Sequence, residues 1–69
     1  MNKQTMEGDW MQLKGKVREQ WGKLTNDDVD IIAGKRDQLI GKIKERYGKT
    51  VEEVDVEVTD FETRHLRAD

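Results

Sequence analysis

An internal repeat constrains the fold of this 69-residue chain more than any other feature of its sequence. Residues 13–23 match residues 39–49 at a constant offset of 26 positions, and Leu, Gly, Lys, Glu, Gly and Lys are identical in the two copies. Each copy continues to a threonine that is followed by acidic residues, at Thr25 and at Thr50. The chain is therefore predicted to contain two similar units, each with a basic helix, a glycine stop and the capped, acidic start of another helix.

The first unit predicts helices at about residues 9–21 and 26–33. In the first helix the large apolar residues recur every three or four positions, which is the spacing of one helical face. These residues are Trp10, Leu13, Val17 and Trp21. Gly22 is expected to stop this helix in a left-handed conformation, and Thr25 is expected to cap the next one. The short apolar side of that second helix consists of Val29, Ile32 and Ala33, and the helix is expected to end or bend near Gly34.

The second unit predicts helices at about residues 35–47 and 51–64. The inner face of the former consists of Leu39, Ile40, Ile43 and Tyr47, and Gly48 is expected to stop it. Thr50 and Glu53 have the spacing of a capping box, which favours a new helix at this point.

The last of these segments has a competing interpretation as a strand. Val54, Val56 and Val58 alternate with a period of two, and β-branched residues suit strands. The capping box, the match to the first copy and the later Phe61 favour a helix whose apolar face also includes Val51. A strand would also find no partner strand elsewhere in the chain.

Gly15 and Gly41 occupy equivalent positions inside the two predicted basic helices. A glycine inside a helix costs about 1 kcal/mol relative to alanine, so a compensating role is expected. A close approach of the backbone to a ligand is one such role. We favour a close crossing of helices, and replacement of either glycine by alanine is then expected to destabilise the fold.

Composition excludes most kinds of chemical site. The chain has no Cys, no Pro, no Ser and one His, so it has no disulfide, no zinc-thiolate site and neither of the commonest nucleophiles. Asp27, Asp28 and Asp30 lack the spacing of a calcium loop and are expected to serve the helix start. His65 is expected to be a structural residue. We expect no catalytic, cofactor or metal site, and core positions for all four aromatic residues, Trp10, Trp21, Tyr47 and Phe61.

The charge is divided unevenly along the chain, although the total is only −2. Residues 1–49 hold 11 basic and 8 acidic residues, a net of +3, whereas residues 50–69 hold 2 basic and 7 acidic residues, a net of −5. Two helices with equivalent lysines could follow a phosphate backbone, so the basic residues form the candidate nucleic-acid site. That site comprises Lys14, Lys16, Arg18, Lys23, Lys42, Lys44, Arg46 and Lys49, with Lys35 and Arg36 nearby. A solvated surface is the alternative interpretation, and the acidic total speaks against a dedicated nucleic-acid domain.

The motifs of the two units resemble the CsbD-like family of bacterial general stress-response proteins. The resemblance is carried by Trp10, by Gly15-Lys16 and by the runs at residues 21–28 and 34–48. It is strong over about residues 9–48 and loose elsewhere, and the last twenty residues are particular to this chain. It implies a small all-α fold of two helical hairpins packed crosswise, in a soluble cytoplasmic protein with no catalytic residues and no cofactor. Its members also resemble, in composition, the very polar hydrophilins that are linked to tolerance of water deficit.

We therefore expect a flexible arm at residues 1–8 and a single all-α domain of four helices at residues 9–66. The favoured function is a non-enzymatic, protective role in stress. The alternative is a nucleic-acid-binding module that uses the first and third helices. No apolar run approaches the length of a membrane span, and no secretory signal opens the chain, so no membrane contact is expected. We expect a monomer or a weak homodimer.

Overall fold

The computed structural model describes residues 6–66, which form four helices and no strand. The helices are α1 (Trp10–Gln20), α2 (Asn26–Ile32), α3 (Arg36–Tyr47) and α4 (Val51–His65). Each begins and ends within one residue of the positions expected from the sequence. The all-α fold is thus confirmed. None of the helices in this part of the chain is both long and apolar enough to cross a membrane.

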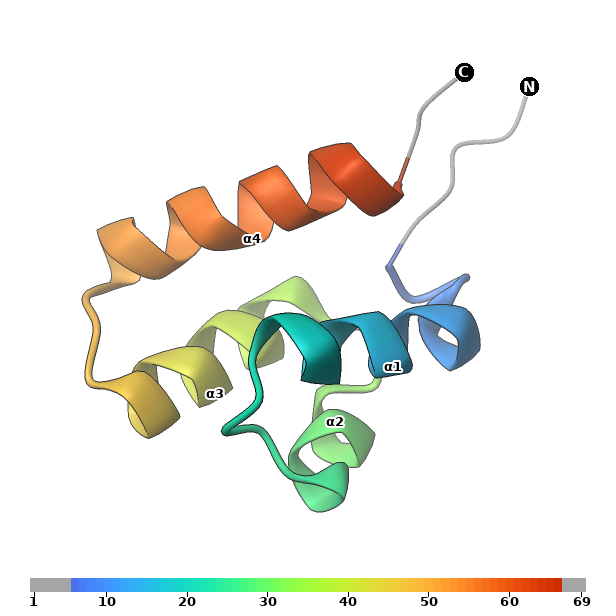
Figure 1. Cartoon of the computed structure of the whole chain (residues 1–69), viewed down its shortest axis with the longest axis horizontal. Helices are drawn as coiled ribbons and strands as arrows, with labels where there is room; N and C mark the ends of the chain where they lie inside the picture. The colour runs from blue at the N-terminus through green and yellow to red at the C-terminus, as the bar shows by residue number, and fades with distance from the viewer. Residues whose placement is uncertain (1–5, 67–69) are drawn as a thin grey trace.

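The helices form two consecutive pairs (Figure 1). In one pair α3 runs into α4 through a short link, and α4 lies along the upper edge of the view. In the other pair α1 leads into the short helix α2, which lies at the lower edge. α3 packs against both α2 and α4, and α1 packs against α2. α3 is therefore the central element of the domain.

One core connects all four helices. The apolar faces expected for α1, α3 and α4 supply most of it. Its buried members are Met6, Trp10, Leu13, Val17, Trp21, Leu24, Val29, Ile32, Leu39, Ile43, Val54, Val58 and Phe61. Ile40 and Tyr47 pack against its edge. Two residues expected on inner faces are instead exposed, because Ala33 lies beyond the end of α2 and Val51 lies in the first turn of α4.

Met6 lies within the stretch that was expected to be an arm, yet its side chain is only 5 % exposed and belongs to the core. Residues 6–9 form turns that lead into α1, and the backbone of Glu7 comes close to Gly34. A Cβ at Gly34 would lie 2.6 Å from the Cα of Glu7, so only glycine fits there. The rest of the expected arm, residues 1–5, lies outside the described residues.

The helix ends follow local sequence rules with one exception. Thr25 and Thr50 both complete capping boxes, with Asp28 and Glu53 as the reciprocal partners. Gly48 ends α3 with φ of 66°, as expected. The expectation for Gly22 is wrong, because its φ is not positive and α1 ends at Trp21, whose φ is −124° and ψ is 82°.

The last segment is a helix, as favoured. Val54, Val58 and Phe61 are fully buried at helical spacing, whereas Val56 is 68 % exposed. An alternating strand would have placed Val56 on the same face as its two neighbouring valines. Burial therefore follows the helical period.

Gly15 and Gly41 do not mark a close helix crossing, and that expectation is wrong. Both glycines are exposed, and nothing lies within 4 Å of the position that a Cβ would take at either of them. The helices approach one another through the apolar faces instead. The expected loss of stability on replacement by alanine therefore has no structural basis.

Candidate functional site

The predicted nucleic-acid site contains two groups of basic side chains that differ in their partners. Lys42, Arg46 and Lys49 each contact a carboxylate from another part of the fold. Among residues 6–66, by contrast, Lys14, Lys16 and Lys44 have no carboxylate within 4 Å. The set predicted from the sequence is thus not one uniform cationic face.

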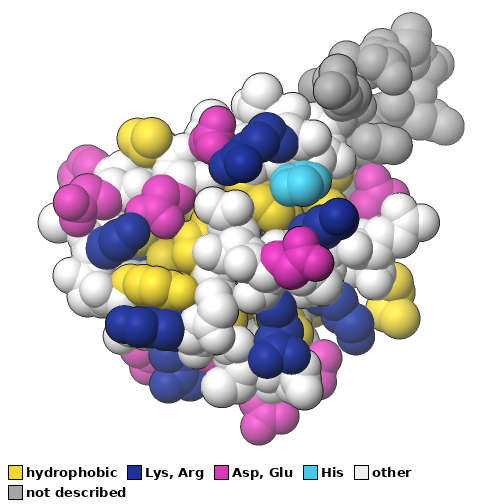
Figure 2. All heavy atoms as spheres, viewed as in Figure 1, with side chains coloured by type: hydrophobic (Ala, Val, Ile, Leu, Met, Phe, Trp, Pro, Cys, Tyr) yellow, Lys and Arg dark blue, Asp and Glu magenta, His cyan; other side chains and the backbone are white. Residues whose placement is uncertain are grey.

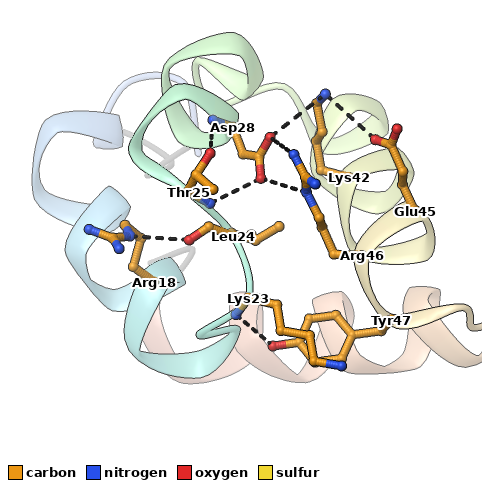
Figure 3. Close-up of polar contacts among 9 residues, drawn as sticks. All are labelled: Arg18, Lys23, Leu24, Thr25, Asp28, Lys42, Glu45, Arg46 and Tyr47. Carbon is orange, nitrogen blue, oxygen red and sulfur yellow. Dashed lines mark hydrogen bonds and ion pairs between the residues drawn. The ribbon is translucent and has the colours of Figure 1, made fainter.

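Asp28 binds two members of the first group, Lys42 and Arg46 (Figure 3). It is the only charged side chain of the described chain that is buried, at 2 % exposure. Arg46 holds both of its oxygens, with Nε 2.9 Å from Oδ2 and one terminal nitrogen 3.0 Å from Oδ1. The backbone N–H of Thr25 donates to Oδ2 at 3.0 Å. The hydrogen bonds from Arg46, and then that from Thr25, hold the pKa of Asp28 well below its ordinary value.

Lys42 extends this cluster toward the solvent. Its Nζ lies 3.8 Å from Oδ1 of Asp28 and 3.6 Å from Oε1 of Glu45 (Figure 3). Lys42 and Arg46 are one helical turn apart on α3, so both reach the N-terminus of α2. The cluster joins these two helices by charge, next to the apolar contact between them.

A second cluster joins the end of α1 to α4. The indole N–H of Trp21 donates to Oε1 of Glu57 at 2.9 Å, and Lys49 Nζ donates to the other oxygen. The hydrogen bond from Lys49, followed by that from Trp21, lowers the pKa of Glu57. The same bond to Glu57 raises the pKa of Lys49. The buried indole therefore has a partner for its polar atom.

Arg36 makes a third link, from the start of α3 to α4. Its guanidinium lies 2.8 Å from Asp55 and 3.1 Å from Glu62, and it also donates to the hydroxyl of Thr59 at 2.9 Å. These three acceptors lie along one side of α4. Arg36 thereby fixes how α4 lies against α3.

Tyr47 packs against the edge of the core, beside two lysines. Its hydroxyl accepts the backbone N–H of Lys23 at 3.1 Å. The ammonium groups of Lys23 and Lys49 lie 5.0 and 5.6 Å from the ring centroid. Such cation–π contacts compete with base stacking. The arrangement ties the α1–α2 link to the end of α3.

The guanidinium of Arg18 binds acceptors within the domain that carry no charge, so its own positive charge is not neutralised. It donates to the carbonyl of Leu24 at 3.3 Å and to Oδ1 of Asn26 at 2.8 Å. Lys14 lies one turn earlier on α1. Both side chains line a groove between α1 and α2, together with Met11 and Gly15.

His65 is half-buried, and its ring lies 4.5 Å from the ring of Phe61. This is the structural position expected for it. Within residues 6–66, no group of three or more His, Cys, Asp or Glu side chains is placed to hold a metal ion. Asp28 is bound by cationic side chains and a backbone donor, so its role is structural.

The sequence did not identify Asp28 as the residue that organises these contacts. A signal was present, because Thr25 and Asp28 have the same spacing as Thr50 and Glu53. Its second partner, Arg46, lies eighteen positions away in the sequence. Only the packing of α2 on α3 brings the two together.

Comparison with known proteins gives consistent results. The model of the CsbD-like family matches residues 4–55. The UPF0337 protein YjbJ of Escherichia coli K12 is 62 % identical over 65 residues, which cover 94 % of each chain. The match extends into the last twenty residues, so the expectation that they are particular to this chain is wrong. The UPF0337 protein ECA0631 of Pectobacterium atrosepticum is 55 % identical over the same share of each. Atu4724 of Agrobacterium fabrum is 71 % identical over 31 residues, 45 % of this chain and 46 % of its own.

Proposed function

Because the chain belongs to the CsbD-like family of bacterial general stress-response proteins, we propose that it protects other cell components without catalysing a reaction. It acts in the cytoplasm as a folded domain that does not aggregate while the cell loses water. The protein resembles hydrophilins in its polar surface, but here that surface covers a packed core.

The observation that carries this proposal is the composition of the surface. The mean hydropathy is −1.00, and charged residues make up 41 % of the chain. In Figure 2, side chains of both signs are interspersed over the visible face. The large exposed hydrophobic residues of the described chain are spread over three helices, as Met11, Ile31, Val51 and Val56. Such a surface binds water and resists aggregation when the protein becomes concentrated.

The ion pairs supply a second argument. They join α2 to α3 through Asp28, α3 to α4 through Arg36, and the α3–α4 link to α4 through Lys49. Loss of water lowers the effective dielectric constant around a protein, which strengthens attraction between opposite charges. Ion pairs therefore stabilise the fold more strongly as water is lost, while the hydrophobic effect, which depends on water, weakens.

A deletion strain tests the protective role. We expect its survival after drying or osmotic shock to fall relative to the parent, and growth without stress to stay unchanged. Expression of the wild-type chain should restore survival. Equal survival of the deletion strain and the parent under these stresses and in stationary phase would rule the proposal out.

A nucleic-acid-binding module is the second candidate. It is supported by Lys14, Lys16 and Lys44, which keep their charges free of carboxylates within the described part of the chain. A short DNA duplex should then bind at low salt and lose affinity as salt rises. Replacement of the three lysines by glutamine should abolish binding, whereas Arg64→Gln on the acidic helix α4 should not. Absence of any binding of the duplex at low salt excludes this candidate.

A further inference from the structure

A groove of about 590 Å³ lies between α1 and α2. We call it the α1–α2 groove. Its α1 wall contains Met11, Lys14, Gly15 and Arg18, and its α2 wall contains Val29 and Asp30. Met11 is 79 % exposed, so a large apolar side chain stands free at this groove.

Gly15 gives the groove its open wall. Nothing lies within 4 Å of the position of a Cβ at Gly15, so the space there is empty of protein atoms. Gly41, its counterpart in the repeat, is equally exposed and open but does not line this groove. The two glycines therefore form a matched pair, of which one borders a groove.

The α1 wall is cationic. Lys14 and Arg18 lie one turn apart, and neither has a carboxylate partner within residues 6–66. Arg18 is bound only by neutral oxygens, those of Leu24 and Asn26. Asp30, on the opposite wall, is the one carboxylate among the lining residues. An anionic surface with an apolar centre fits this wall.

The chain itself carries such a surface on α4. Glu52, Val56 and Asp60 follow one another at four-residue spacing, all exposed, on the side of α4 away from its buried valines. We call these three residues the outer face of α4. Val56 is 68 % exposed, and within residues 6–66 the one partner of Asp60 is Arg64, on the same helix. Residues 50–69, with 2 basic and 7 acidic residues, carry a net of −5.

We propose that the α1–α2 groove of one copy of this protein binds the outer face of α4 of a second copy. Val56 meets Met11 and the open wall at Gly15, while Lys14 and Arg18 face Glu52 and Asp60. α2 and α4 lie at opposite edges of the molecule, so one copy can use both surfaces at once (Figure 1). The contact then joins copies head to tail in short rows. A single helix in a groove makes a small interface, so the association is weak and reversible.

A dilution series followed by amide NMR tests this contact, independently of any protective role. Between about 50 µM and about 2 mM at low salt, the amides of residues 11–18 and 52–60 should shift together, as expected for an affinity near the millimolar range. Added salt should reverse the shifts, because exposed charges are screened. Concentration-independent spectra, or shifts confined to other surfaces, would overturn the proposal. Shifts at Lys14 and Gly15 that appear only when duplex DNA is added would also overturn it.

Two sets of variants sharpen the test. Gly15→Gln fills the groove and should abolish the concentration dependence, whereas Gly41→Gln adds the same side chain outside the groove and should preserve it. Lys14→Glu and Glu52→Lys should each abolish self-association. A mixture of these two variants retains one intact pair of surfaces and should associate again. If the mixture stays monomeric, or if both glycine variants behave alike, the assigned surfaces are wrong.

Discussion

At the scale of single residues, Asp28 is the one charged side chain that is buried among residues 6–66. It caps α2 through Thr25 and binds Arg46 of α3 with both oxygens. Burial of a carboxylate is costly unless its oxygens are satisfied. Here a guanidinium fork and a backbone N–H satisfy them, so the charge is retained inside the domain.

Asp28→Asn should lower the free energy of unfolding by about 1–3 kcal/mol, because the amide cannot accept both bonds from Arg46. Thermal unfolding followed by circular dichroism measures the change. Asp30→Asn removes an exposed carboxylate from the same helix and should change stability by less than about 0.5 kcal/mol. Equal effects of the two substitutions would contradict the role assigned to Asp28.

The same residue predicts sensitivity to acid. Its pKa is lower in the folded state than in the unfolded state, so the unfolded chain binds more protons as the pH falls. The stabilisation is therefore complete above the unfolded carboxyl pKa of about 4 and is lost progressively below it. The melting temperature should fall between pH 5 and pH 2 for the wild type, and less steeply for Asp28→Asn. Parallel curves would show that Asp28 does not supply this dependence.

At the scale of elements, the sequence predicted the helices well because their signals are local. Apolar spacing and threonine caps depend only on residues within a few positions. The glycines were harder to interpret, since the sequence does not reveal what faces a residue. Gly15 and Gly41 face open space, whereas Gly34, in a left-handed conformation, lies against Met6 and Glu7. The burial of Met6 was missed for the same reason.

Alanine substitutions should separate these glycines. Gly15→Ala and Gly41→Ala should each stabilise the protein by about 0.5–1 kcal/mol, because alanine favours the helix and meets no neighbour. Gly34→Ala should destabilise it, since a Cβ would lie 2.6 Å from the backbone of Glu7 at a φ of 83°. Denaturant unfolding of the three variants gives the order of their stabilities. A loss of stability in both helical variants would contradict the open surroundings assigned to the two glycines.

At the scale of the whole molecule, the candidate site was only partly predictable. The sequence identified the basic residues of α1 and α3, but not that Lys42, Arg46 and Lys49 are engaged by carboxylates. Those pairings connect different helices, and a linear sequence does not state which helices meet. The charge asymmetry could be read directly from the sequence, and the links from Arg36 and Lys49 to α4 show where it is used. The domain is held together by its charges as well as by its core.

The central claim is that the folded domain, and not its polar composition alone, protects other proteins. The most direct measurement is the activity that a drying-sensitive enzyme retains after drying with the wild type or with Phe61→Asn. Phe61 is fully buried, and its loss should cost about 3–5 kcal/mol, enough to unfold a domain of this size without changing its charge. Phe61→Leu is the folded control. We predict protection by the wild type and Phe61→Leu and much weaker protection by Phe61→Asn, and equal protection by all three would contradict the claim.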